Sequence, residues 1–275
     1  MSNRHGEERR AIITALKISR PEYGPILDLH LALEVSAGMT RPPAALPTLD
    51  RPALEAALKA GTPLFSPARL PLDLAAAAGA MGAFEQVKVP RQVELGQAVK
   101  LINSEEGGFP GMAALFLAGR HSDMKALAEK AGVKAELVFY LIQLALKPSL
   151  RAVNRAVDQI IEERGWREGF CPLCGSEPAM ARLEPAGQRT LHCGLCGREW
   201  RFSRMDCPFC RTADQERISY LFVEGEAGYR LYTCQGCGRY LKTLDARVRS
   251  DPAPLDLEDL TTMHLDILAQ KKGFR

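Results

Sequence analysis

The eight cysteines of this 275-residue chain fall into four Cys-x-x-Cys pairs, and none is left over. Two cysteines separated by two residues can present both sulfurs to one metal ion when the backbone between them forms a tight turn, here called a knuckle. Two knuckles complete a tetrahedron of sulfur. The four pairs therefore predict two mononuclear metal sites, each with four thiolate ligands.

The spacing of the knuckles predicts which of them share an ion. The gaps between successive pairs are 18, 10 and 23 residues. A gap of 18 or 23 residues suits a β-hairpin that carries the second knuckle back to the first, whereas 10 residues suit a connector. Sequential pairing follows, and an interleaved pairing remains the alternative. The sequential sites are Cys171, Cys174, Cys193 and Cys196, and Cys207, Cys210, Cys234 and Cys237.

The residue after each pair supports this interpretation. Gly175, Gly197 and Gly238 directly follow a second cysteine, and Arg211 takes that place in the third pair. A chain that curls around a metal ion often needs a positive φ at this point, which glycine adopts without steric cost. We expect the three glycines to be left-handed.

Tetrahedral four-sulfur sites accept either zinc or mononuclear iron. Zinc would hold together two small ribbons that have too little core to fold alone. Iron is the metal of rubredoxins, whose knuckles the stretches CPLCG at 171–175 and CPFC at 207–210 resemble. Dithiol redox chemistry fits poorly, because four pairs on ribbons lack the strand-to-helix placement that acidifies one thiol.

No catalytic constellation emerges from the rest of the sequence. It contains no Ser/His/acid arrangement, no carboxylate pair and no phosphate-binding glycine loop, so we assign no catalytic residues and expect no enzyme. His192 adjoins a cysteine but is expected to be a hairpin residue, and Trp200 to fill a small ribbon core. Leu173, Leu195 and Phe209 lie between ligands, where they form either an exposed apolar rim or contacts inside the protein.

The elements that must position these knuckles are of two kinds. Up to about residue 165, apolar residues recur at helical spacing, as at Ile26, Leu29 and Leu33. Residues 135–165 predict one or two long helices bent at Pro148, and proline-rich stretches at 41–52 and 62–71 predict loops. After Trp166 the pattern alternates as in short strands and hairpins.

We therefore predict an α+β multidomain protein. An N-terminal all-α helical domain is followed by two small rubredoxin-like, or zinc-ribbon-like, metal-binding β modules and by a C-terminal helix that packs back on the fold. The predicted boundaries are 1–165 for the helical domain, 166–204 for the first module, 205–250 for the second module and 251–275 for the C-terminal helix.

Composition bears on the cellular compartment of the protein. The longest uncharged apolar run, 74–84, has 11 residues, well short of the roughly 20 that cross a bilayer. The first ten residues carry both charge signs and lead into no apolar signal segment. We expect a cytoplasmic protein without a membrane span. A reducing compartment disfavours four lasting disulfides, so metal ligation is the favoured role of the thiols.

Charge argues against a nucleic-acid partner. Residues 166–250 contain 13 Lys or Arg and 10 Asp or Glu, and two four-thiolate sites at −2 each would turn this +3 margin into −1. Phosphate binding normally needs a marked basic excess. A zinc-ribbon nucleic-acid module nevertheless stays an alternative, as does a rubredoxin-like electron carrier.

From Cys171 to its end, over 105 residues, the chain resembles the formate dehydrogenase accessory protein family, FdhE. The four pairs, the LHC that ends at Cys193, the EW at 199–200, the GRYLK at 238–242 and a final acidic helix that ends in GF recur in that order. The helical half resembles the family in character alone. The N-terminus is shorter than in the family, and the extension beyond the final GF is missing.

The resemblance implies a cytoplasmic accessory factor rather than an enzyme. Such a factor binds the catalytic subunit of a respiratory formate dehydrogenase while that enzyme is assembled, and the metal-stabilised ribbons would take part in binding. The resemblance also implies rubredoxin-like iron at the same eight cysteines, with zinc as the alternative. The oligomeric state stays open, with a homo-oligomer as one option.

Overall fold

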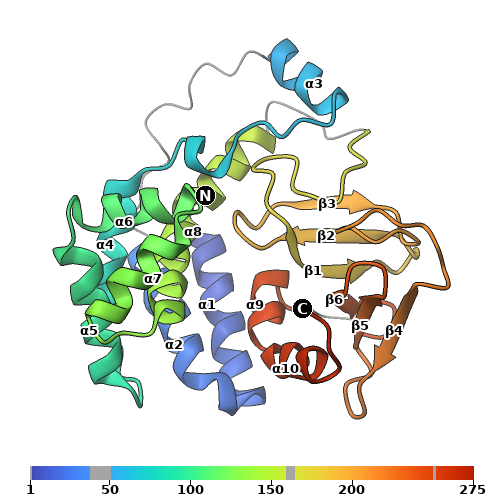
Figure 1. Ribbon diagram of the computed structural model, residues 1–275. Coiled ribbons are helices and arrows are strands. Elements are labelled where there is room, and N and C mark those ends of the chain that lie inside the picture. Colours follow the sequence, from blue (N-terminus) through green and yellow to red (C-terminus); the bar gives the residue numbers. More distant parts are fainter. Residues whose placement is uncertain (1, 38–50, 159–164, 250–251) are drawn as a thin grey trace. The chain divides into compact units, whose positions relative to one another are not determined.

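The computed structural model describes residues 2–37, 51–158, 165–249 and 252–275. These residues form a helical region, then a sheet region that contains the four cysteine pairs, then C-terminal helices, which confirms the predicted fold class (Figure 1). The chain divides into two compact units, which we call the helical unit (Met1–Thr48 and Pro67–Val157) and the sheet unit (Leu49–Ser66 and Asp158–Arg275). The segment Leu49–Ser66, which the sequence places in the helical half, therefore belongs with the sheet.

The helical unit buries the apolar stripes that its sequence predicts. Leu27, Leu33, Phe84 and Ile142 are fully buried in its core. Its helices are α1 (Ser2–Ser19), α2 (Gly24–Ala37), α4 (Leu74–Glu85), α5 (Gln92–Ser104), α6 (Gly108–Leu117), α7 (His121–Lys130) and α8 (Ala135–Asp158). No helix among the described residues is both long enough and apolar enough to cross a membrane.

Two segments for which the sequence makes predictions are described only in part by the structure. The segment 135–165 begins as one helix, α8, which continues through Pro148 to Asp158, and residues 159–164 lie outside the described residues. The proline-rich stretch 62–71 is a loop apart from the short 3₁₀ turn Pro67–Arg69, as predicted. In the stretch 41–52, residues 41–50 lie outside the described residues, and Arg51 and Pro52 begin helix α3 (Arg51–Lys59) rather than a loop.

Polar groups fix the ends and the interior of the helical unit. The Asp73 carboxylate caps α4 by accepting a hydrogen bond from the backbone N–H of Ala76 at 2.9 Å. In the interior, the 5 % exposed Glu34 carboxylate pairs with Arg9 at 2.8 Å and with Arg151 at 2.7 Å. The buried charge is thus compensated from two other helices.

The two predicted modules share one sheet. Its strands are β1 (Pro178–Leu183), β2 (Arg189–Cys193), β3 (Glu199–Phe202), β4 (Ile218–Phe222), β5 (Tyr229–Cys234) and β6 (Arg239–Asp245). Their order is β3-β2-β1-β6-β5-β4. Within each module the strands are antiparallel, whereas β1 and β6 pair in parallel and join the modules edge to edge.

The C-terminal segment packs on this sheet as two helices, α9 (Leu255–Leu260) and α10 (Met263–Lys271), where the sequence predicts one (Figure 1). Thr261 and Thr262 separate them, and their hydroxyls donate to the carbonyls of Leu257 and Glu258 at 3.0 and 2.7 Å. Such side-chain bonds compete with the helical backbone pattern. The resulting core between helices and sheet consists of Met180, Tyr229, Leu231, Leu244, Leu255, Leu265 and Ala269.

Candidate metal centres

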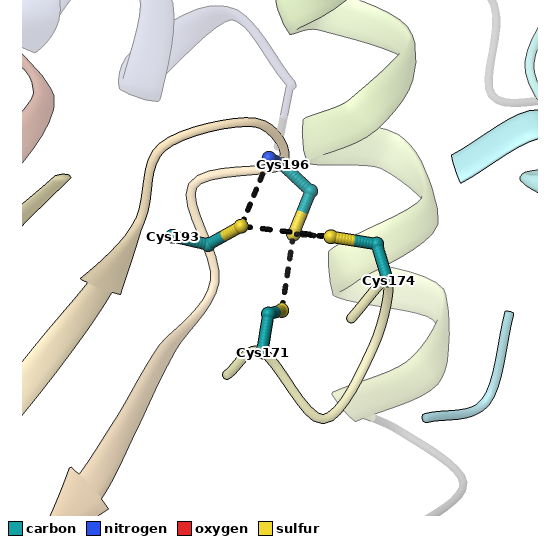
Figure 2. Close-up of side chains that lie close together, drawn as sticks. All are labelled: Cys171, Cys174, Cys193 and Cys196. Atoms are coloured by element: carbon teal, nitrogen blue, oxygen red, sulfur yellow. Dashed lines mark hydrogen bonds between the residues drawn. The ribbon is translucent and has the colours of Figure 1, made fainter. Parts of the chain in front are cut away.

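The first four-cysteine group is closed to solvent. Its sulfurs point toward one another from two facing knuckles (Figure 2). The Sγ–Sγ distances are 3.5 Å for Cys171 with Cys196, 3.5 Å for Cys174 with Cys193 and 3.6 Å for Cys174 with Cys196. All four side chains are at most 2 % exposed.

The second group repeats this geometry nearer the surface. Its Sγ–Sγ distances are 3.8 Å for Cys207 with Cys237 and 3.7 Å for Cys210 with Cys234. Cys210 is exposed and Cys237 is half-buried. The eight sulfurs thus group by sequential pairing, and the interleaved alternative does not occur.

All four knuckles close with the same backbone hydrogen bond. The N–H of the residue that follows the second cysteine donates to the carbonyl of the first, as from Gly175 to Cys171 at 2.9 Å. The same bond runs from Gly197 to Cys193, from Arg211 to Cys207 and from Gly238 to Cys234. The φ values of these four residues lie between 62° and 74°, as predicted for the three glycines.

The sulfur positions fit a tetrahedral ion. With metal–sulfur bonds of about 2.3 Å, the edges of a regular tetrahedron measure about 3.8 Å. The observed edges of 3.5 to 3.8 Å are close to that value and far longer than a disulfide bond. In the first site the N–H of Cys196 also donates to the Cys193 sulfur at 3.4 Å, which stabilises negative charge there.

Burial opposes the ionisation of all four thiols of the first site in the absence of a cation. Burial raises the pKa of Cys171 well above its ordinary value, whereas hydrogen bonds from Cys171, Cys193 and Cys196 lower the pKa of Cys174. At the second site, burial raises the pKa of Cys237 to about 12. A bound cation would allow all four thiols to lose their protons, because its positive charge compensates the negative charge of the buried thiolates.

A segment from far upstream covers the first knuckle. The backbone N–H groups of Leu64 and Phe65 donate to the carbonyls of Pro172 and Leu173, both at 2.9 Å. Leu173 is fully buried, so of the two alternatives, an exposed rim or contacts inside the protein, the second holds for this residue. Sequence reasoning missed this strap, residues 62–65. The prolines at 63 and 67 indicate extended backbone but do not name its partner.

The other singled-out residues have structural roles. His192 lies in β2 and belongs to neither metal-binding group, as predicted. Trp200 is 3 % exposed and its indole N–H donates to the carbonyl of Glu168 at 3.1 Å, which confirms a core position. Leu195 and Phe209 are half-buried, and the Arg239 guanidinium lies 4.1 Å from the Phe209 ring centre.

The difference in burial predicts a difference in metal release. With two ions bound, a chelator should remove the ion at the second site at least ten times faster than the ion at the first. The physical reason is that Cys210 is exposed, whereas every thiol of the first site is buried. Chelator absorbance should show two phases of equal amplitude, and Cys207→Ala with Cys210→Ala should abolish the fast one. A single phase would contradict the prediction.

Arg211 is the one described non-glycine residue with a positive φ, at 62°. A left-handed residue with a Cβ costs about 1 kcal/mol. Arg211→Gly should therefore be about 1 kcal/mol more stable than Arg211→Ala in urea unfolding, since both variants lose the same ion pair with Glu168. Gly238→Ala, where a Cβ meets nothing within 4 Å, should lose a similar amount. Equal stability of the two Arg211 variants would refute the backbone explanation.

The sequence of the chain is similar to that of known proteins. Residues 170–204, which contain the whole first site, match the family model described as FdhE, central domain. A protein FdhE homolog of Aquifex aeolicus is 30% identical over 148 residues, which cover 52% of this chain and 51% of the relative. A homolog from Enterobacter sp. is 35% identical over 117 residues, or 41% of this chain and 37% of the relative. The chain thus spans about half, or less, of the curated relatives it matches.

One solved structure has the same fold over nearly the whole chain. The crystal structure of the FdhE protein from Pseudomonas aeruginosa aligns with a TM-score of 0.70. The alignment covers 97% of this chain and 91% of the other, at 22% sequence identity.

Two four-cysteine groups on one sheet, with a helical unit before them in the sequence and two helices after them, define a class of protein that could hold two metal ions. Within that class, the chain is similar to FdhE proteins in three ways: residues 170–204 match the FdhE central domain, curated FdhE homologs match up to about half of the chain, and the fold is shared with an FdhE protein.

Proposed function

We propose that this protein is a cytoplasmic accessory factor for formate dehydrogenase, which binds the catalytic subunit during maturation and does not itself catalyse a reaction. The observation that carries the proposal is the coincidence of the family's central domain with the first four-cysteine site. Each module, 166–204 and 205–250, would bind one ion through its four cysteines. The sheet would then present a rigid surface to the partner.

Iron is the favoured ion at both sites and zinc the alternative. The Cys-Pro-x-Cys knuckles at 171–174 and 207–210 support iron because rubredoxins use the same knuckle. The sulfur tetrahedra fit either metal. Protein prepared without oxygen distinguishes them, because oxidised iron in such a site is red and zinc is colourless. Metal analysis should find two ions per chain.

The accessory role can be tested in bacteria that lack their own FdhE. The wild-type chain should restore formate dehydrogenase activity, and a tagged copy should retain the unassembled catalytic subunit in a pull-down. Met205→Ala, which changes an exposed side chain outside the cysteine sites, serves as the control variant. Failure of the wild-type chain both to restore activity and to retain the subunit would refute the proposal.

Electron transfer is a second candidate function because one observation favours it. Cys210 is exposed and Cys237 is half-buried, so iron at the second site would lie close to solvent and to a redox partner. Rapid reversible reduction by a soluble reductase, combined with no affinity for the catalytic subunit, would favour this candidate. Partner binding by the zinc-loaded protein would favour the accessory role.

A further inference from the structure

The two outer strands of the sheet, β3 and β4, differ in how their edges are protected. Strand β3 has four residues, of which Glu199 and Arg201 are charged, and its Trp200 and Phe202 are buried. Strand β4 has the sequence ISYLF, with neither charge nor proline. Within the described residues no strand pairs with its outer edge.

An edge strand presents a row of unpaired N–H and C=O groups, and proteins normally blunt such edges with charges, prolines or bulges. None of these devices occurs within β4, and its pairing with β5 is regular from Ile218 to Phe222. The edge is therefore suited to accept another strand through backbone hydrogen bonds.

The side chains of β4 add an aromatic surface. Tyr220 is 46% exposed and Phe222 is 66% exposed. Their rings meet edge to face at 5.1 Å, and Tyr220 also lies 5.7 Å from the ring of Tyr232 on β5. Arg230, which is paired with Asp245, holds its guanidinium 5.4 and 5.0 Å from the Tyr220 and Phe222 ring centres. Ring–ring and cation–π contacts thus fix the Tyr220 and Phe222 side chains, which are still open to solvent.

The two modules repeat the same order of elements, and the first module shows how the corresponding edge is paired elsewhere in this chain. In the first module, β1 occupies the place of β4, as the first strand after the first knuckle. The outer edge of β1 is covered by β6, which pairs in parallel from Met180 opposite Lys242 to Leu183 opposite Asp245. In the second module the corresponding position, beyond β4, is available.

We propose that β4 receives an extended, largely uncharged segment of the formate dehydrogenase catalytic subunit, which adds a parallel seventh strand to the sheet. This inference rests on the proposed function and names its binding surface. Alternate side chains of the segment pack on Tyr220 and Phe222, so apolar residues suit it. A second copy of the chain is a poorer occupant, because its outer strand β3 carries Glu199 and Arg201. Its other outer strand, β4, would pair antiparallel by two-fold symmetry, unlike the parallel cover that β6 gives β1.

The test compares hydrogen exchange of the full-length chain with and without the catalytic subunit, together with affinities of two variants. The amides of β4 should exchange at least ten times more slowly in the complex. Phe222→Glu should weaken binding at least tenfold, because it places a charge on the edge, while Arg230 opposite it favours folding of the variant. Met205→Glu, at a 53% exposed apolar residue outside the sheet, should bind as the wild type does.

The outcomes separate the two proposals. A complex in which β4 exchange is unchanged and Phe222→Glu binds normally overturns the edge assignment and leaves the accessory role standing. Absence of any complex overturns the accessory role and, with it, this inference. Sedimentation of the free chain as a dimer that Phe222→Glu dissociates would assign the edge to a second copy and also overturn the proposal.

Discussion

Replacing Cys171 and Cys174 together by alanine should remove one of the two bound ions and unfold the first module. Binding of a structural zinc ion contributes about 10 to 16 kcal/mol in small zinc domains, which is as much as the stability of a whole domain, about 5 to 15 kcal/mol. Both cysteines are fully buried, so water cannot reach the ion and replace the two lost sulfur ligands. Strands β1, β2 and β3 should lose their fixed pairing.

Metal analysis and tryptophan fluorescence measure this outcome. One ion per chain should remain, and the emission of the two tryptophans, Trp166 and Trp200, now 7% and 3% exposed, should shift to that of solvated indoles. The matched control is Cys207→Ala with Cys210→Ala, which removes as many thiols from the more open site. It should also lose one ion but keep Trp200 buried. A first-site variant that retains two ions, or a buried Trp200, would contradict the assignment.

The two four-cysteine groups were the most predictable part of this protein. A Cys-x-x-Cys turn is local, and the residue after Cys174 or Cys196 has to adopt a left-handed conformation for the chain to curl around the sulfurs. The gaps of 18 and 23 residues leave room for one hairpin each. The grouping of the sulfurs therefore followed from distances along the chain alone.

The contacts between remote segments were not predictable in this way. The strap at 62–65 reaches the first knuckle through backbone hydrogen bonds, which any residue with an N–H can make, so Leu64 and Phe65 carry no signal for their partner. The parallel pairing of β1 with β6 likewise depends on backbone groups of strands far apart in sequence. The merging of two modules into one sheet was hidden for the same reason.

Two stretches that carry the family resemblance contact each other through side-chain hydrogen bonds and ion pairs. Residues 239–242 of the GRYLK stretch form the start of β6, and the acidic C-terminal segment forms α9 and α10. Tyr240 donates its hydroxyl hydrogen to Asp266 at 2.8 Å, and Lys242 bonds both Asp259 and Asp266. Burial, followed by the bond to Asp266, raises the pKa of Tyr240 and keeps its hydroxyl protonated. These motif residues hold the C-terminal helices on the sheet.

Lys242→Ala should therefore release those helices. The Lys242 ammonium is 3 % exposed and lies 2.7 Å from an oxygen of each of Asp259 and Asp266. It also donates to the backbone carbonyl of Asp259 at 2.8 Å. Removing one member of a buried ion pair costs about 3 kcal/mol or more. Since about 1.4 kcal/mol corresponds to a factor of ten, the amides of α10 should exchange with solvent about a hundred times faster.

The effect should reach the second metal site, because the N–H of Arg275, just beyond α10, donates to the carbonyl of Gly238 at 2.9 Å and so ties the chain to the fourth knuckle. Lys242→Ala should thus also accelerate loss of the second-site ion to a chelator while leaving the first-site phase unchanged. Lys271→Ala, which removes an exposed lysine from the same helix, is the matched control and should change neither rate. Unaltered exchange of the α10 amides in Lys242→Ala would show that apolar packing on the sheet holds the helices without this ion pair.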